Sequence, residues 1–229
     1  MRTSPSRQES GSNGRRKNTA PVRRVRLSPA DRERMILDAA INFFAEKGFQ
    51  ADTRSLAEHI GVSQALIYKY FGSKEDLIER VYERTFLSRW NPNWESILSE
   101  RARPLRERLT DFLKSYIAAI DDRNWVRITM HSSLEGSNLT RRYIQSQITH
   151  LLALIVAELR AEAKAPAEAE PSAMELELAW HLHSTAIYYL VRKHIHGTPV
   201  SLQTDKIVNM IVDNFLDGTR NTRFPTGAR

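Results

Sequence analysis

Apolar residues recur at helical spacing along almost the whole chain from Ser28 onward. The first run places Ile36, Phe43 and Phe44 on one face of a helix that ends at Gly48. Runs with the same period cover residues 104–121, 123–135, 138–164, 173–196 and 201–217. No segment shows the sustained apolar-polar alternation that is typical of a strand. The pattern therefore predicts an all-α fold.

Two short helices joined by a tight turn are predicted between residues 53 and 71. Thr53 can cap the first helix, and Gly61 supplies its left-handed end. Ser63 can cap the second, which reads QALIYKYF and ends before Gly72. Two helices connected by Gly-Val-Ser have the spacing of a helix-turn-helix.

The second of these helices carries more large side chains than so short a helix can bury. At about 100° per residue, Ile67 and Phe71 share one side and can pack on the neighbouring helices. The other side chains then form an exposed patch, which is unfavourable unless it meets a partner. An amide, small apolar groups, hydroxyls and a cation suit the major groove and phosphates of DNA. The alternative, that Tyr68 and Tyr70 merely cover the helix packing, stays open.

Charge and composition divide the chain into an arm and two domains. The formal charge is +7, from 34 basic and 27 acidic side chains. Residues 1–27 hold eight basic and one acidic side chain, so the rest of the chain holds 26 of each sign. We expect a disordered basic arm over residues 1–27, which either neutralises nucleic-acid phosphates or only solubilises the terminus. The segment Trp90-Asn91-Pro92-Asn93-Trp94 predicts a break, and we expect domains over residues 28–86 and 87–229.

Several classes of protein are disfavoured by the residues. The chain has no cysteine, its longest apolar run is far too short to span a membrane, and no signal peptide is evident, so we expect a cytoplasmic protein. Ser132 and Ser133 lie near His131 and Glu135, but no G-x-S-x-G turn and no glycine-rich phosphate loop occur, which argues against an enzyme. His181 and His183 are two residues apart, as are His194 and His196, so each pair points to different sides of a helix. Glu177 and His181 are four apart but offer only two ligands, so neither a metal site nor a cofactor is expected.

The segment DTRSLAEHIGVS at residues 52–63, followed by QALIYKYFGSKEDL, resembles the TetR family of bacterial transcriptional regulators. The resemblance covers about residues 30–86 and implies an N-terminal helix-turn-helix domain, followed by a larger helical domain that binds an effector and dimerises. It implies that bases or the groove are contacted by Gln64, Ala65, Leu66 and Tyr70, and phosphates by Thr53, Arg54, Tyr68, Lys69 and Lys74. The family often has a small or hydroxylated residue where this chain has Leu66, so an apolar contact is expected there.

The larger domain is expected to supply a dimer interface and a pocket. The resemblance implies pairing through two C-terminal helices, at about residues 174–196 and 201–218. Aromatic bulk with a few polar tips suits a ligand pocket, although it suits an ordinary core as well. The candidates are Phe112, Tyr116, Trp125, Met130, His131, Tyr143, Gln147, Trp180, His183 and Tyr188.

These expectations together describe a homodimeric repressor that binds a near-palindromic operator, associates with the nucleoid when bound to DNA, and is released by a small-molecule effector. The alternative is a DNA-binding regulator or activator that has no such effector and is controlled by a protein partner. A helical enzyme or adaptor, in which the helix-turn-helix is only structural, is a third reading.

Overall fold

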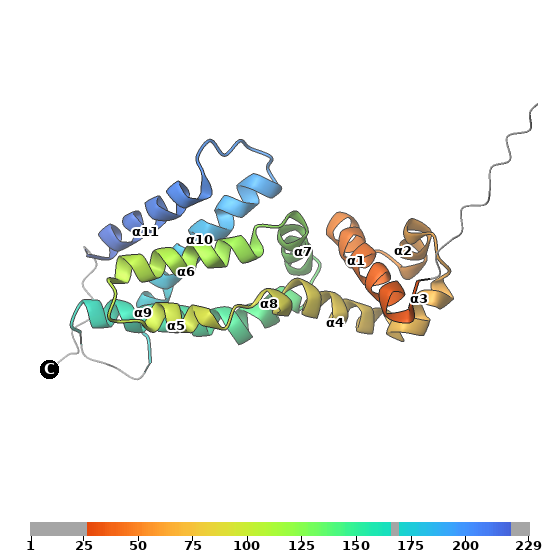
Figure 1. Cartoon of the computed structure of the whole chain (residues 1–229), viewed down its shortest axis with the longest axis horizontal. Helices are drawn as coiled ribbons and strands as arrows, with labels where there is room; N and C mark the ends of the chain where they lie inside the picture. Colours follow the sequence, from red (N-terminus) through yellow and green to blue (C-terminus); the bar gives the residue numbers. More distant parts are fainter. Residues whose placement is uncertain (1–26, 166–169, 221–229) are drawn as a thin grey trace, which may run out of the picture.

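The computed structural model describes residues 27–165 and 170–220, and this part of the chain is helical throughout apart from its turns and loops (Figure 1). The all-α prediction is confirmed. The predicted basic arm lies outside the described residues, except for Leu27. The α-helices, in chain order, are α1 (Pro29–Lys47), α2 (Thr53–Ile60), α3 (Gln64–Phe71), α4 (Lys74–Thr85), α5 (Asn93–Ser99), α6 (Leu105–Ile120), α7 (Arg123–Leu134), α8 (Leu139–Tyr143), α9 (Thr149–Glu162), α10 (Ala173–His194) and α11 (Thr204–Arg220).

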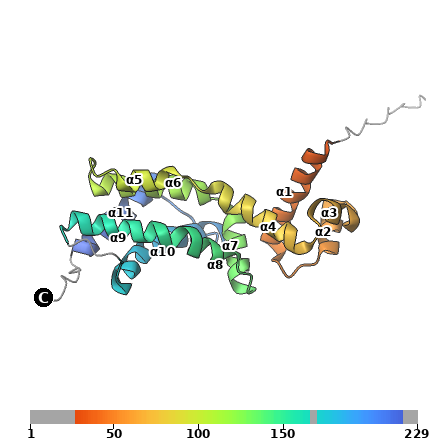
Figure 2. The same ribbon diagram turned by 90° about the horizontal axis from the view of Figure 1, so that it is seen from below.

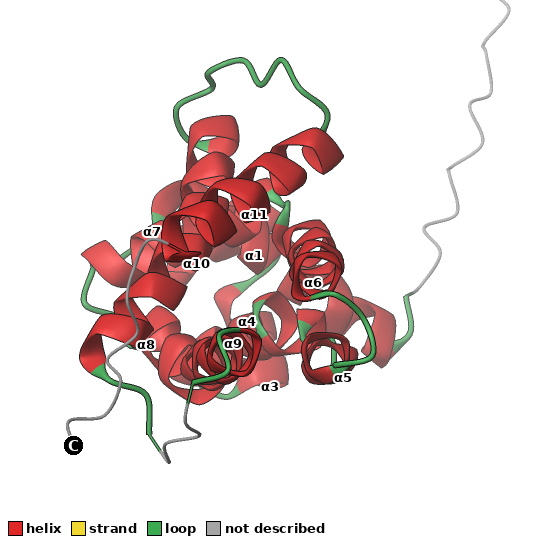
Figure 3. Cartoon of the chain, turned by 90° about the vertical axis from the view of Figure 1, so that its left-hand side faces the viewer, coloured by secondary structure: helices red, strands yellow, loops and turns green. Residues whose placement is uncertain are grey.

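The helices form two groups that α4 connects. Helices α1, α2 and α3 gather at one end, and α5 to α11 form the larger bundle (Figure 1). Figure 2 shows α4 running from the small group into the bundle, where α5 and α6 lie on one side and α9 on the other. Figure 3 looks along the bundle and shows α5, α6 and α9 nearly end-on. The small group is therefore carried at the end of a long helical body.

Side-chain caps fix the helix starts near the N-terminal end. Ser63 caps α3 by accepting a hydrogen bond from Leu66 N, and Ser73 caps α4 through Asp76 N, at 3.2 and 3.0 Å. The prediction that Thr53 caps α2 is wrong, because Asp52 is the N-cap and accepts from Ser55 N at 2.7 Å. Thr53 becomes the first residue of α2, so its hydroxyl is free to bond elsewhere.

Two features of the bundle differ from the expected pattern. The break at residues 90–94 is shorter than predicted, because α5 begins at Asn93 and buries Trp94 and Leu98, which lie four residues apart on one face. The long run over residues 138–164 is one helical path, but a π-helical turn, Ile144–Ile148, interrupts it between α8 and α9. Such wide turns are rare and are often found at functional sites.

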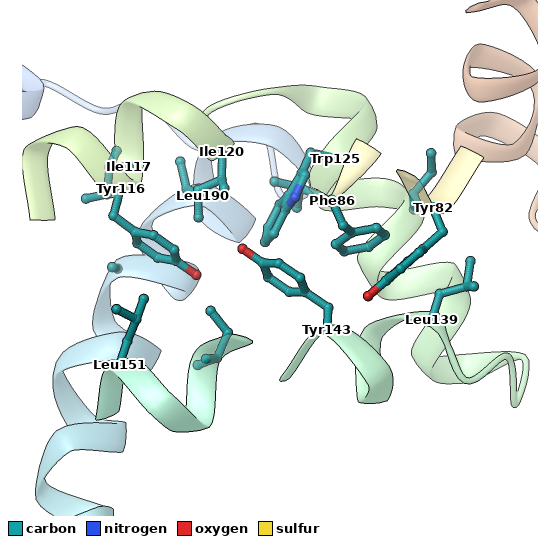
Figure 4. Packing of buried hydrophobic residues seen from close by; sticks show 14 of the residues in the cluster. Tyr82, Phe86, Tyr116, Ile117, Ile120, Trp125, Leu139, Tyr143, Leu151 and Leu190 are labelled. Atoms are coloured by element: carbon teal, nitrogen blue, oxygen red, sulfur yellow. The ribbon is translucent and has the colours of Figure 1, made fainter. Parts of the chain in front are cut away.

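One apolar core extends through both groups of helices. Phe86, which follows α4, is fully buried, and its ring centroid lies 5.8 Å from that of Trp125 and 5.2 Å from that of Tyr143 (Figure 4). The last residue of the predicted first domain thus packs inside the second. Over residues 27–165 and 170–220, no helix has the length and apolar character needed to cross a membrane.

Candidate nucleic-acid interface

Helix α3 is held to the small group of helices by one side only. Ile67 is fully buried and Phe71 is 5% exposed, which confirms the predicted anchoring pair. Gln64, Ala65 and Lys69 are exposed, as is Tyr68. The predicted groove contacts Leu66 and Tyr70 are half-buried and pack against the core, so they lie at the rim of this surface.

Hydrogen bonds connect the exposed end of α3 with the start of α2. The amide nitrogen of Gln64 donates to Thr53 Oγ1 at 2.7 Å, and Thr53 Oγ1 lies 2.8 Å from Tyr68 Oη. Thr53, a predicted phosphate contact, is only 5% exposed. The three side chains therefore link α2 to α3, and the carbonyl oxygen and second N–H of Gln64 stay available to a base.

The predicted phosphate contacts Arg54 and Lys74 lie beside α3 on neighbouring elements. Arg54 is paired with Glu58 at 3.3 Å, but both side chains are largely exposed, so the pair contributes little and the guanidinium can exchange it. Lys74 is the first residue of α4 and has no ion-pair partner in the described part of the chain. A cation beside free N-terminal N–H groups suits a phosphate.

A carboxylate of the larger bundle holds the turn that precedes α2. Glu135, at the end of α7, accepts from the backbone N–H of Phe49 at 2.6 Å and from that of Gln50 at 3.0 Å. Its other oxygen lies 2.8 Å from His131 Nδ1, so His131, a predicted pocket residue, is used here. Sequence reasoning did not find this contact, because 86 residues separate Glu135 from Phe49 and no local signal marks it.

Two further groups of ion pairs join the bundle to α1 and to the connecting helix α4. Arg123 and Arg127 pair with Glu46 at the end of α1, and the Arg123 guanidinium lowers the pKa of that carboxyl. Arg142 forms a two-pronged pair with Glu79 on α4, at 2.7 and 2.9 Å. The orientation of α3 relative to the bundle is thus set by contacts to both α1 and α4.

The remaining predicted pocket residues lie in four different environments. Phe112, Tyr116 and His183 line a small cavity between α6, α9 and α10. Trp125 and Tyr143 are buried in the same bundle, whereas Met130, Gln147 and Trp180 are half-buried. The structure does not bring Tyr188 into the interior, since its side chain is 62% exposed on α10.

The polar groups of this interior are neutral at physiological pH. His183 Nε2 lies 3.0 Å from Tyr116 Oη, and burial lowers the pKa of His183 to about 4. Burial also raises the pKa of Tyr116 and that of Tyr143. Within the described residues, no group of three or more His, Asp or Glu side chains is placed to hold a metal ion.

Comparison with known proteins gives matches that agree with this arrangement. Residues 36–81 match the family described as bacterial regulatory proteins, tetR family. The HTH-type transcriptional repressor KstR2 of Mycolicibacterium smegmatis is 34% identical over 97 residues, which are 42% of this chain and 46% of that protein. The fatty acid metabolism regulator protein of Bacillus subtilis is 27% identical over 108 residues, 47% of this chain and 55% of that protein. The match therefore spans about half the length of each relative.

A solved structure of another protein has a similar fold. The crystal structure of a TetR-like transcriptional regulator from Rhodococcus sp. RHA1 superposes with a TM-score of 0.63 and 20% sequence identity, covering 86% of this chain and all of that one. This likeness extends over both groups of helices. It supports the architecture of the larger bundle, to which the family match at residues 36–81 does not extend.

Proposed function

We propose that this chain, which belongs to the TetR family of bacterial regulatory proteins, is a homodimeric, ligand-responsive transcriptional repressor. The observation that supports the proposal is that α3 is buried on one side and exposed on the other. Ile67 and Phe71 anchor it, while Gln64, Ala65 and Lys69 remain exposed on a capped helix at the end of the molecule. A helix presented in this way can enter the major groove of DNA.

DNA binding would use the exposed residues in two roles. Gln64 and Ala65 would face base edges, with Leu66 and Tyr70 at the rim of the groove. The carbonyl oxygen and second N–H of the Gln64 amide would bond an adenine edge or a phosphate. Phosphates would be held by the remaining contacts, which are Thr53, Arg54, Tyr68, Lys69 and Lys74. Such contacts position the protein but do not read sequence.

A second copy of the chain would pair through α10 and α11. Met174 and Tyr188 on α10 and Met210 on α11 are half exposed or more, which is unusual for large apolar side chains. A dimer would cover them and place two α3 helices on one DNA molecule. Half-sites about 34 Å apart, or a multiple of this spacing, then give a near-palindromic operator.

An effector in the larger bundle would release the DNA. Release requires that the effector bind more tightly to an arrangement whose α3 helices no longer match the two half-sites. The ion pairs and the Glu135 contact that join the two groups of helices would transmit such a change. We place the protein in the bacterial cytoplasm, where its operator DNA lies.

The alternative function is a DNA-binding regulator or activator that has no small-molecule effector and is controlled by a protein partner. One observation favours it: the cavity lined by Tyr116 and His183 has a volume of only about 10 Å³. That is about the room one water molecule needs. An effector must therefore open the bundle in order to enter.

Selection of bound sequences from random duplex DNA tests the proposal. We expect an enriched pair of inverted half-sites, with affinity that falls steeply as salt is raised. Gln64→Ala should change the enriched sequence, whereas Lys206→Ala, an exposed lysine on α11, should leave it unchanged. If no DNA sequence were enriched and the affinity for DNA did not change with salt, sequence-specific DNA binding would be ruled out. The helix-turn-helix would then have only a structural role.

A further inference from the structure

A buried hydroxyl lies at the contact between α2 and α3, at the end of the molecule (Figure 1). Thr53, the first residue of α2, is only 5% exposed, whereas Gln64, the first residue of α3, is exposed. Asp52 caps α2, so the cap does not use the Thr53 hydroxyl. That hydroxyl bonds α3 instead, through Gln64 and Tyr68, which lie one turn apart on the same face.

The bond to Thr53 decides which groups Gln64 presents to a partner. A glutamine side chain has two N–H donors and one carbonyl oxygen. One N–H is donated to Thr53 Oγ1 at 2.7 Å, and the same nitrogen lies 3.5 Å from Tyr68 Oη, at the limit of a hydrogen bond. Within residues 27–165 and 170–220, the carbonyl oxygen of Gln64 has no hydrogen-bond partner. The amide therefore presents one donor and one acceptor.

One donor beside one acceptor matches adenine better than guanine. In the major groove, adenine offers the acceptor N7 and the donor N6–H₂, whereas guanine offers two acceptors, N7 and O6. A glutamine with both N–H groups free can turn its NH₂ toward those two acceptors. Holding one N–H inside the protein removes this option, so the contact with Thr53 favours adenine.

The burial of Thr53 and Tyr68 indicates how their hydroxyl hydrogens are arranged in the DNA complex. Thr53 Oγ1 and Tyr68 Oη are 2.8 Å apart, so one of the two hydrogens lies between them and the other is left over. Phosphate oxygens need a donor, and Tyr68 is 38% exposed whereas Thr53 is covered. Thr53 therefore donates to Tyr68, and Tyr68 donates to the phosphate. Of the proposed phosphate contacts, Thr53 thus acts through Tyr68.

We propose that Thr53 is a positioning residue for base reading, which makes adenine the preferred base at the operator position that Gln64 faces. It holds the Gln64 amide in the orientation that fits adenine, and through Tyr68 it connects that orientation to a phosphate of the same DNA. A side chain held in this way loses less freedom when DNA binds. The inference rests on the proposed function, because it assigns a specificity-determining residue to the same helix-turn-helix.

The base preference at one operator position tests the proposal. This position is the one at which Gln64→Ala relaxes the sequence selected from random duplex DNA. The affinity of the full-length protein is then measured by fluorescence anisotropy for the selected duplex and for a duplex in which that A·T pair is replaced by G·C. We expect the parent to prefer adenine by about tenfold or more.

Two substitutions of Thr53 separate the hydroxyl from the shape of the side chain. Thr53→Val removes the hydroxyl but not the cap of α2, which Asp52 supplies, and should lower the adenine preference by about threefold or more. Thr53→Ser keeps the hydroxyl and should keep the preference. Thr110→Val on α6 is the matched control, because that buried hydroxyl has no hydrogen-bond partner among residues 27–165 and 170–220, and it should change nothing.

Two further variants distinguish positioning from a general effect on the helices. Tyr68→Phe removes a phosphate contact but leaves Gln64 on Thr53, so it should weaken binding to both duplexes alike, about three- to tenfold. In a Gln64→Ala background, Thr53 has no amide to hold, and Thr53→Val should leave the ratio of the two affinities unchanged. A changed ratio in that background would overturn the positioning role.

The outcomes separate this inference from the proposed function. The inference would be overturned if Gln64→Ala relaxed no position, if the parent selected a base other than adenine there, or if the preference survived Thr53→Val. Each of these results leaves sequence-specific binding by the parent intact. Failure of the parent to select any DNA sequence would overturn the proposed function instead. Loss of the adenine preference in Thr53→Val, with its retention in Thr53→Ser, would support both.

Discussion

The contact between Glu135 and the turn before α2 predicts that substitutions at Gly48 and at Glu135 have strongly coupled effects on stability. Gly48 has φ 77° and ψ 176°, a conformation that is almost restricted to glycine, and a Cβ there would overlap the Glu135 carboxylate. Gly48→Ala must therefore strain the backbone and also expel the carboxylate from the N–H groups of Phe49 and Gln50. Glu135→Ala removes the same two hydrogen bonds without touching the turn.

The expected magnitude follows from the two bonds. Hydrogen bonds to a charged group contribute about 1.5–3 kcal/mol each, and the 18% exposure of the Glu135 side chain reduces this somewhat. We expect a joint contribution of about 3 kcal/mol. The backbone strain of Gly48→Ala, about 1–3 kcal/mol, is present in either background and cancels. The double variant should therefore be about 3 kcal/mol more stable than the sum of the two single effects implies.

A double-mutant cycle measures this coupling. The free energy of unfolding is determined by urea denaturation for the parent, Gly48→Ala, Glu135→Ala and the double variant. Gly61→Ala serves as a control, because Gly61 also has a positive φ of 76° but a Cβ there meets nothing within 4 Å. Additive effects of Gly48→Ala and Glu135→Ala, within about 0.5 kcal/mol, would refute the reasoning.

The remaining predictions concern DNA contacts, pairing and pH. Lys74→Ala should weaken binding to all DNA sequences alike and should lower the slope of log affinity against log salt concentration by about one. Gln64→Ala should instead change the preferred sequence. An altered sequence preference in Lys74→Ala would contradict these roles. Met210→Glu places a charge on the half-exposed face of α11 and should shift the protein toward monomer in sedimentation velocity, so an unchanged dimer would argue against pairing there. His183 has a pKa of about 4 when folded and near 6.5 when unfolded, so the unfolded chain binds more protons between these values. As the pH is lowered from 6.5 to 4, the free energy of unfolding should therefore fall by up to about 3 kcal/mol because of His183. His183→Gln should show a smaller fall over this range. Parallel curves of unfolding free energy against pH for the parent and the variant would contradict the lowered pKa of His183.

The local features of the helix-turn-helix were predictable because neighbouring residues determine them. Ser63 caps α3 as expected, and Gly61 takes the left-handed conformation that ends α2. The angular separation of apolar positions was enough to assign Ile67 and Phe71 to the core. Each of these inferences depends on residues within about one helical turn of each other.

The errors and omissions arise where tertiary contacts decide. Asp52 and Thr53 are both good caps, and the structure uses Asp52, leaving the Thr53 hydroxyl to bond Gln64 and Tyr68. Helical spacing alone cannot separate an inward aromatic from one on the outer face, and Tyr188 proves to be exposed. The Glu135 contact joins segments 86 residues apart, and a single sequence carries no signal for such pairs.

The position of α7 explains how a change in the interior can reach α3. Near its start, Trp125 packs on Phe86, at the end of α4; at its other end, Glu135 holds the turn before α2. The small group of helices is thus attached to the bundle through α4 and, separately, through α7. A change in how Trp125 packs on Phe86 would therefore act at both attachments of the small group of helices.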